Sequence, residues 1–187
     1  MRIIGGKFKG RPIEFIKSSV TRPLKDSVKE NIFNIIVHSK KINIDIINSK
    51  ILDLYSGIGS FGIEALSRGA KKVTFIENNK FTINILKKNI KNFSIQDKTE
   101  LIENDIFSAI KNEKIDKFDL LFLDPPFKDD SFINIFELIK IKKNYSKKSI
   151  VIIHREKKTN DNLDKFLSVF LIKTYGRSKI LFANFLT

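Results

Sequence analysis

The sequence predicts an α/β fold in which a mostly parallel, doubly wound sheet is followed by an antiparallel C-terminal hairpin. Three observations support this prediction. From residue 50 onward, apolar strand-like runs alternate with helical segments. Several of these runs are continuously apolar, as expected of strands whose two faces are both covered by helices. The last two runs have no helix between them, which is typical of a hairpin at a sheet edge.

The elements follow from the spacing of apolar residues. Five strands are expected, at Ile51–Tyr55, Val73–Glu77, Thr99–Glu103, Phe118–Asp124 and Ile150–His154. Between and after them, helices are expected at Gly59–Arg68, Lys80–Asn92, a short stretch after Asp105, and Ser131–Ile141. The C-terminal hairpin joins Leu167–Thr174 to Lys179–Leu186. This order is similar to the S-adenosylmethionine (SAM) methyltransferase version of the Rossmann-like architecture.

Composition limits the classes of function. The 187 residues carry a formal net charge of +14, which favours a polyanionic partner such as nucleic acid. An AT-rich genome, which favours Lys, Ile, Asn and Phe codons, is the alternative source of part of this charge. The absence of cysteine excludes disulfides and thiol catalysis, and the two histidines are too far apart in sequence to predict a metal site. With no long apolar stretch, we expect a cytoplasmic protein that binds neither membrane nor metal.

A glycine-rich loop after the first strand predicts a cofactor site. Glycines at 57, 59 and 62 satisfy the G-x-G-x-x-G pattern between a strand and a helix. The pattern alone does not separate NAD from SAM. Asp53 separates them, because a carboxylate at this place opposes an anionic pyrophosphate but suits the ammonium and sulfonium of SAM.

Two further acidic residues follow the next strands. Glu77 ends the second strand, where a carboxylate accepts hydrogen bonds from ribose hydroxyls. Asp105 follows the third strand, where it either accepts the adenine amino group beside the Ile106 backbone or simply caps a helix. The predicted cofactor-binding residues are Asp53, Tyr55, Ser56, Gly57, Gly59, Glu77, Asn78, Asp105 and Ile106.

A second motif follows the fourth strand, namely Asp124, Pro125, Pro126 and Phe127. The two prolines lack N–H donors, so their carbonyls and the Asp124 carboxylate form a cluster of acceptors. Such a cluster holds an –NH2 group by its hydrogens and stabilises the positive charge that grows on nitrogen during attack on a methyl group. Phe127 offers a flat face for stacking a base. The fifth strand ends in His154-Arg155-Glu156, to which we assign no role.

With both motifs in place, the chain resembles the bacterial 16S rRNA guanine-N2 methyltransferases of the RsmD type. The resemblance runs nearly end to end, through residues 1–11, 21–34, 52–70 and the Asp-Pro-Pro-Phe tetrapeptide. It implies SAM as the methyl donor, a guanine N2 amine as acceptor, and small-subunit rRNA or its assembling particle as partner. Tyr55, Ser60 and the end of the fifth strand depart from the expected pattern.

The resemblance and the charge divide the chain into a basic N-terminal arm, residues 1–25, and a catalytic core, residues 26–187, within a single domain that we expect to be monomeric. The arm begins with a small β-hairpin whose turn is expected at Gly5-Gly6, and a helix follows at Asp26–His38, with Ser27 and Glu30 forming a capping box. The predicted RNA-binding residues are Arg2, Lys7, Lys9, Arg11 and Arg22.

Three alternatives stay open at this stage. The same acceptor cluster serves adenine-N6 or cytosine-N4 methylation of DNA, although no separate target-recognition segment is evident in the sequence. A protein glutamine-N5 methyltransferase also presents an –NH2 to such a cluster, although the basic arm disfavours it. A non-catalytic RNA-binding assembly factor that retains the fold is the alternative from a different class.

Overall fold

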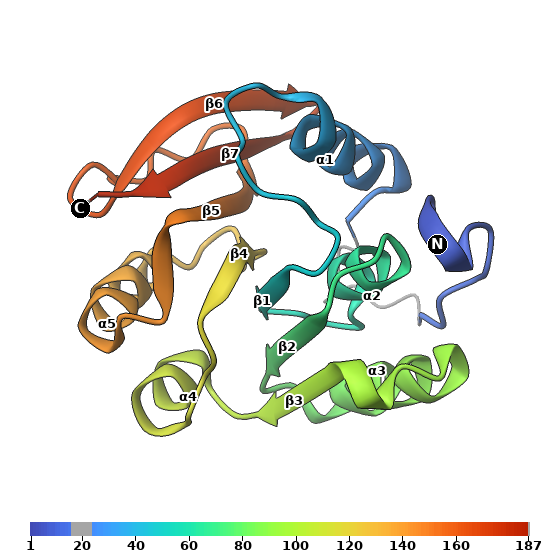
Figure 1. Ribbon diagram of the computed structural model, residues 1–187. Helices are drawn as coiled ribbons and strands as arrows, with labels where there is room; N and C mark the ends of the chain where they lie inside the picture. The colour runs from blue at the N-terminus through green and yellow to red at the C-terminus, as the bar shows by residue number, and fades with distance from the viewer. Residues whose placement is uncertain (16–23, 187) are drawn as a thin grey trace.

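The computed structural model describes residues 1–15 and 24–186. One seven-stranded sheet crosses this part of the chain in the order β3-β2-β1-β4-β5-β7-β6 (Figure 1). Strands β1 to β5 are parallel to one another, whereas β7 is antiparallel to both β5 and β6. The predicted parallel sheet with a C-terminal hairpin is therefore confirmed. The strands are β1 (Lys50–Leu54), β2 (Lys72–Glu77), β3 (Thr99–Glu103), β4 (Phe118–Leu123), β5 (Tyr145–Glu156), β6 (Leu167–Tyr175) and β7 (Ser178–Phe185).

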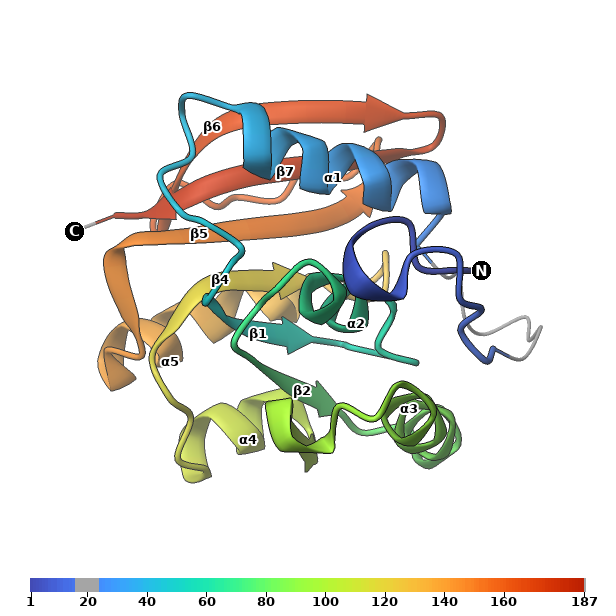
Figure 2. The same ribbon diagram turned by 45° about the vertical axis from the view of Figure 1, so that its right-hand side comes forward.

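Helices cover both faces of the sheet (Figures 1 and 2). One face carries α1 (Asp26–His38), α2 (Ser60–Ser67) and α3 (Lys80–Phe93). The other carries α4 (Ile106–Asn112) and α5 (Ile135–Lys142). Short 3-10 helices are η1 (Gly6–Phe8), η2 (Gln96–Lys98) and η3 (Ser131–Asn134).

Strand β4 shows why the central strands are apolar throughout. Leu120 and Phe122 pack into the core beneath α1, α2 and α3, whereas Leu121 and Leu123 pack into the core beneath α4 and α5. Successive side chains of a strand point to opposite faces, so a strand covered on both sides has no polar face.

The strand order indicates where a ligand site is expected. The chain proceeds outward from β1 to β3 on one side and from β4 to β5 on the other, so the direction of winding changes between β1 and β4. In open parallel sheets, a crevice forms outside the carboxyl ends of the strands at such a switch point. The turns that follow β1, β2 and β4 all lie at this edge.

The N-terminal loop, residues 1–13, reverses direction as expected, but its turn differs from the prediction. Ile3 N donates to Arg11 O at 3.0 Å, as in a hairpin. The reversal is made by the 3-10 helix η1 (Gly6–Phe8), and not by a tight turn at Gly5-Gly6. Gly6 has a φ of +75°, and a Cβ there would lie 1.9 Å from the carbonyl oxygen of Ser67 in α2. Close contact with a helix therefore determines the shape of this turn.

Side chains of α2 hold the N-terminal loop in place. The buried carboxylate of Glu64 accepts hydrogen bonds from Ile4 N at 2.7 Å and from Gly5 N at 2.8 Å. The hydroxyl of Ser67 accepts one from Phe8 N at 2.9 Å. The basic loop is thus bound to the helix that begins in the glycine-rich loop.

Helix α1 begins one residue earlier than its predicted cap. Its first residue is Asp26, as predicted, its N-cap is Lys25, and the Lys25 side chain makes no capping hydrogen bond. The expected capping box is wrong because Ser27 lies inside the helix and not at its N-cap position.

The described part of the chain, residues 1–15 and 24–186, has no helix that is long and apolar enough to cross a membrane. Within the same two ranges, no three His, Asp or Glu side chains are grouped in a way that would hold a metal ion.

Candidate active site

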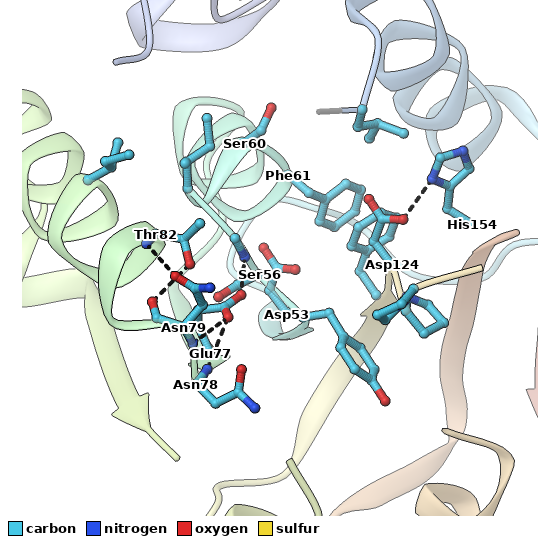
Figure 3. Close-up of a pocket in the computed structure, with 18 of the residues that line it drawn as sticks. Asp53, Ser56, Ser60, Phe61, Glu77, Asn78, Asn79, Thr82, Asp124 and His154 are labelled. Atoms are coloured by element: carbon cyan, nitrogen blue, oxygen red, sulfur yellow. Dashed lines mark hydrogen bonds and ion pairs between the residues drawn. The ribbon is translucent and has the colours of Figure 1, made fainter. Parts of the chain in front are cut away.

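A pocket of about 430 Å³ opens at the carboxyl edge of the sheet, around the switch point between β1 and β4 (Figure 3). Its volume falls within the range of small-molecule sites. Figure 3 shows Glu77, Asp53 and Asp124 following one another along the pocket. The pocket brings together most of the predicted cofactor residues and the whole second motif, namely Asp53, Tyr55, Ser56, Gly57, Glu77, Asn78, Asp124, Pro125, Pro126 and Phe127.

Asp53 is a buried acid with one unused oxygen. Its Oδ2 accepts a hydrogen bond from Gly62 N at 3.0 Å, at the first turn of α2. Its Oδ1 is buried without a partner among the described residues. Burial raises the pKa of the Asp53 carboxyl well above its ordinary value, and the hydrogen bond from Gly62 opposes this effect. A cationic group bound at Oδ1 would satisfy this oxygen and favour the ionised carboxylate.

Glu77 organises the loops beside Asp53. Its carboxylate accepts from Gly57 N at 2.7 Å, from Asn78 N at 3.0 Å and from Asn79 N at 2.9 Å. A carboxylate offers about four acceptor positions, so about one remains available to a hydroxyl group in the pocket. The same residue that was predicted to hold a ribose therefore also shapes the glycine-rich loop.

Three predicted cofactor residues do not line the pocket. Gly59 has a φ of +82° and packs so tightly that a Cβ would lie 2.4 Å from Leu86 Cδ1, so its role is to allow the loop to turn. Asp105 caps α4, because its Oδ1 accepts from Ser108 N at 3.1 Å. Ile106 is buried under the sheet edge. Direct cofactor contact by these three residues stays a prediction.

The turn after β4 presents fewer acceptors than the sequence implies. The Pro126 carbonyl already accepts from Asp129 N at 2.9 Å and from Arg155 Nη1 at 3.0 Å. No hydrogen bond from the described residues reaches the Pro125 carbonyl or the Oδ2 atom of Asp124. Among the described residues, the acceptors of this turn without a hydrogen-bond donor are therefore Asp124 Oδ2 and the Pro125 carbonyl.

A hydrogen bond joins the loop after β1 to the segment that follows the second motif. The hydroxyl of Tyr55, directly after β1, donates to Asp129 Oδ2 at 3.0 Å. Burial and the Asp129 carboxylate raise the pKa of Tyr55, so the hydroxyl keeps its proton. Tyr55 thus connects the glycine-rich loop to Asp129, whose N–H donates to the Pro126 carbonyl, and this contact gives its departure from the expected pattern a structural role.

Sequence reasoning missed part of the pocket wall. His154, near the end of β5, contacts Asp124 and lines the pocket. The rule that sites form at carboxyl ends of strands pointed to this position, but the residue type gave no specific signal. Phe15 and Phe81 also line the pocket and are 40% and 54% exposed. Neither belongs to a motif, so only the structure places them there.

The predicted RNA-binding residues lie on the N-terminal loop, where Arg2, Lys7, Lys9 and Arg11 are exposed. Arg11 also has a structural contact, because its Nη2 donates to Asn92 O at 2.7 Å at the end of α3. Its guanidinium lies 4.4 Å from the ring centre of Phe93. Arg22 lies outside the described residues.

The N-terminal loop is connected to the pocket. Glu14 N donates to Asn89 Oδ1 at 2.9 Å, and Asn89 Nδ2 donates to Ile58 O in the glycine-rich loop at 3.1 Å. The next residue, Phe15, lines the pocket. The chain that follows the basic loop therefore reaches the pocket, whereas Arg11 itself lies at the carboxyl end of α3.

The fold and this pocket define a methyltransferase of the Rossmann type. A putative methylase from Haemophilus influenzae has a crystal structure that is 31% identical, with a TM-score of 0.77 over 100% of this chain and 98% of that chain. A putative methyltransferase crystallised in complex with SAH shares the fold, with 14% identity and a TM-score of 0.63 over 83% of this chain and 49% of that chain.

The family follows from the sequence comparisons. The family model described as "Conserved hypothetical protein 95" matches residues 1–184, and the chain belongs to this family. A relative from Buchnera aphidicola, named "Ribosomal RNA small subunit methyltransferase D", is 36% identical over 156 residues, which cover 83% of this chain and 78% of the relative.

Proposed function

We propose that this protein transfers a methyl group from SAM to the exocyclic N2 amine of a guanine in small-subunit ribosomal RNA. The observation that carries the proposal is the meeting of two motifs in one pocket. Asp53 and Glu77 form the part suited to a cationic nucleoside, and Asp124 with Pro125 forms the part suited to an amine. The name of the Buchnera relative supports rRNA as the class of substrate.

The residues around Asp53 fit SAM. The unpartnered Asp53 Oδ1 suits its ammonium group, and Glu77 has an acceptor position left for a ribose hydroxyl. When bound, SAM supplies an electrophilic methyl group on a positively charged sulfur. The complex of the structural neighbour with SAH, the product of SAM after methyl transfer, supports this choice of donor.

Asp124 and Pro125 prepare the amine. A base amine is a weak nucleophile because its lone pair is delocalised into the ring. Hydrogen bonds from its two N–H groups to the Asp124 carboxylate and the Pro125 carbonyl orient the nitrogen and stabilise the positive charge that develops on it. Phe127 lines the same pocket and provides an aromatic surface for the base. No strong base is needed before transfer, since the proton leaves afterwards.

A transfer assay separates this function from its alternatives. Purified protein with tritiated SAM should label unmethylated small-subunit rRNA, either naked or in particles, and digestion should recover the label as N2-methylguanosine. Label in DNA alone, or in a glutamine-containing protein alone, would replace the proposal with one of those reactions. Calorimetry that detects no SAM binding would favour a non-catalytic assembly factor.

The basic N-terminal loop is expected to bind the RNA backbone. Changing Lys7 and Lys9 together to Gln should weaken RNA binding and reduce the slope of log K against log salt by about 0.7–0.9 for each phosphate that the protein no longer neutralises. Arg11 is left intact because it also packs on α3. Filter binding over a range of salt concentrations measures the slope.

The matched control removes the same charge elsewhere. Lys147 and Lys148 are exposed near the amino end of β5, at the sheet edge opposite the pocket. Their change to Gln should leave the slope within error of the wild type. Equal effects of the two double variants would mean that the N-terminal loop has no particular part in RNA binding.

A further inference from the structure

Asp124 shares its carboxylate with a histidine from the neighbouring strand. His154 Nδ1 lies 2.8 Å from Asp124 Oδ1 (Figure 3). The parallel register pairs Leu123 with Ile153, so the residues that follow them are adjacent. An ionised carboxylate only accepts hydrogen bonds, so Nδ1 carries the proton in this pair.

The imidazole is more buried than the carboxylate that it contacts. The His154 side chain is 10% exposed, whereas that of Asp124 is 24% exposed. The ring of Phe127 meets the imidazole edge-on, with ring centres 5.8 Å apart and planes at 74°. His154 therefore contacts two of the four residues of the Asp-Pro-Pro-Phe turn.

The next residue along β5 holds a third member of that turn. Arg155 Nη1 donates to the Pro126 carbonyl at 3.0 Å, from the opposite face of the strand. The end of β5 thus contacts Asp124, Pro126 and Phe127, which are three of the four residues of the turn.

We propose that His154 is a positioning residue for the methyl-transfer reaction. Its Nδ1–H holds Asp124 Oδ1, which fixes the carboxylate plane and leaves Oδ2 to accept the N–H of the substrate amine. Without this donor, the partly exposed carboxylate turns toward water and its contact with the amine loosens. The inference rests on the proposed function, because it assigns Asp124 to the amine.

Two amide variants distinguish positioning from a purely structural role. The side-chain nitrogen of Asn occupies nearly the place of imidazole Nδ1, whereas that of Gln occupies nearly the place of Nε2. His154→Asn should therefore restore the hydrogen bond to Asp124. His154→Gln is the matched control, since it has the same functional group and places it elsewhere.

The kinetic test compares His154→Ala, His154→Asn and His154→Gln on rRNA. We expect His154→Ala and His154→Gln to lower kcat by about 10- to 100-fold, with KM for RNA and Kd for SAM within about twofold of the wild type. His154→Asn should recover kcat to within about fivefold of the wild type. Unchanged kcat in His154→Ala, or equal kcat in the Asn and Gln variants, would overturn the positioning role.

NMR tests the pair without any RNA. The protein has only two histidines, so His38→Gln identifies the signals of His154 in a ¹⁵N-labelled sample. A proton on Nδ1 in this sample, with a changed Nδ1 signal in Asp124→Ala, is the expected result. An Nδ1 atom of His154 that carries no proton would overturn the inference. A wild-type protein that labels no guanine would overturn the proposed function instead, and the spectrum would then still decide whether the Asp124–His154 hydrogen bond exists.

Discussion

Asp124→Ala is expected to lower methyl transfer by at least about 100-fold while leaving the affinity for SAM within a few-fold of the wild type. The carboxylate accepts an N–H of the amine and stabilises the positive charge of the transition state, an effect absent from SAM binding alone. Single-turnover labelling of rRNA gives the rate, and calorimetry with SAM gives the affinity.

Asp124→Asn is the conservative control. The amide keeps a carbonyl acceptor but loses the negative charge, so its rate should lie between those of the wild type and Asp124→Ala. The melting temperatures of both variants should stay close to that of the wild type, because Asp124 is partly exposed and its side chain is bonded only to His154 among the described residues. A strong loss of SAM affinity in either variant would assign Asp124 to the cofactor and not to the amine.

The second large effect is on stability. Arg155→Met is expected to lower the free energy of unfolding by about 3–5 kcal/mol, because it leaves a buried carboxylate unpaired. Arg155 is fully buried and binds Asp161, which is 3% exposed, through Nε and Nη2 at 2.8–3.1 Å. Its guanidinium also lies over the ring of Phe132 at 4.7 Å. Urea unfolding followed by circular dichroism measures the change.

Two further variants test whether the unpaired buried charge causes the loss of unfolding free energy in Arg155→Met. The double variant Arg155→Met, Asp161→Leu removes both charges and should be more stable than Arg155→Met alone. Lys50→Met breaks an exposed pair with Asp116 and should change the unfolding free energy by no more than about 1 kcal/mol. A loss below about 1 kcal/mol in Arg155→Met would mean that the buried pair contributes no more than a surface one.

Most of the fold could be predicted because its signals are local. The apolar runs of β1 and β4 and the amphipathic pattern of α3 are visible within short windows of sequence. The prediction of a tight turn at Gly5-Gly6 was wrong because the shape of this loop depends on contacts with α2, which lies some 60 residues later in the chain. Tertiary contacts of this kind leave no local pattern.

The residues of the candidate site also divide into those that the sequence predicted and those that only the structure revealed. Asp53, Glu77 and Asp124 were predicted to share a site because carboxyl ends of neighbouring parallel strands meet at one edge, and all three line the pocket. Phe81 and His154 were not predicted to belong to the site, because an aromatic residue or a histidine at a strand or helix end has many common roles. The sequence could not show that the Pro126 carbonyl already accepts a hydrogen bond, because its donor, Arg155, lies on β5.

The attachment of the N-terminal loop to α2 has a consequence for the choice of target. Glu64 and Ser67 tie the basic loop to the helix that starts beside the pocket. In the proposed complex, this attachment would fix the distance between the phosphates bound by the loop and the amine in the pocket. That distance would then help to determine which guanine of the bound RNA reaches the pocket.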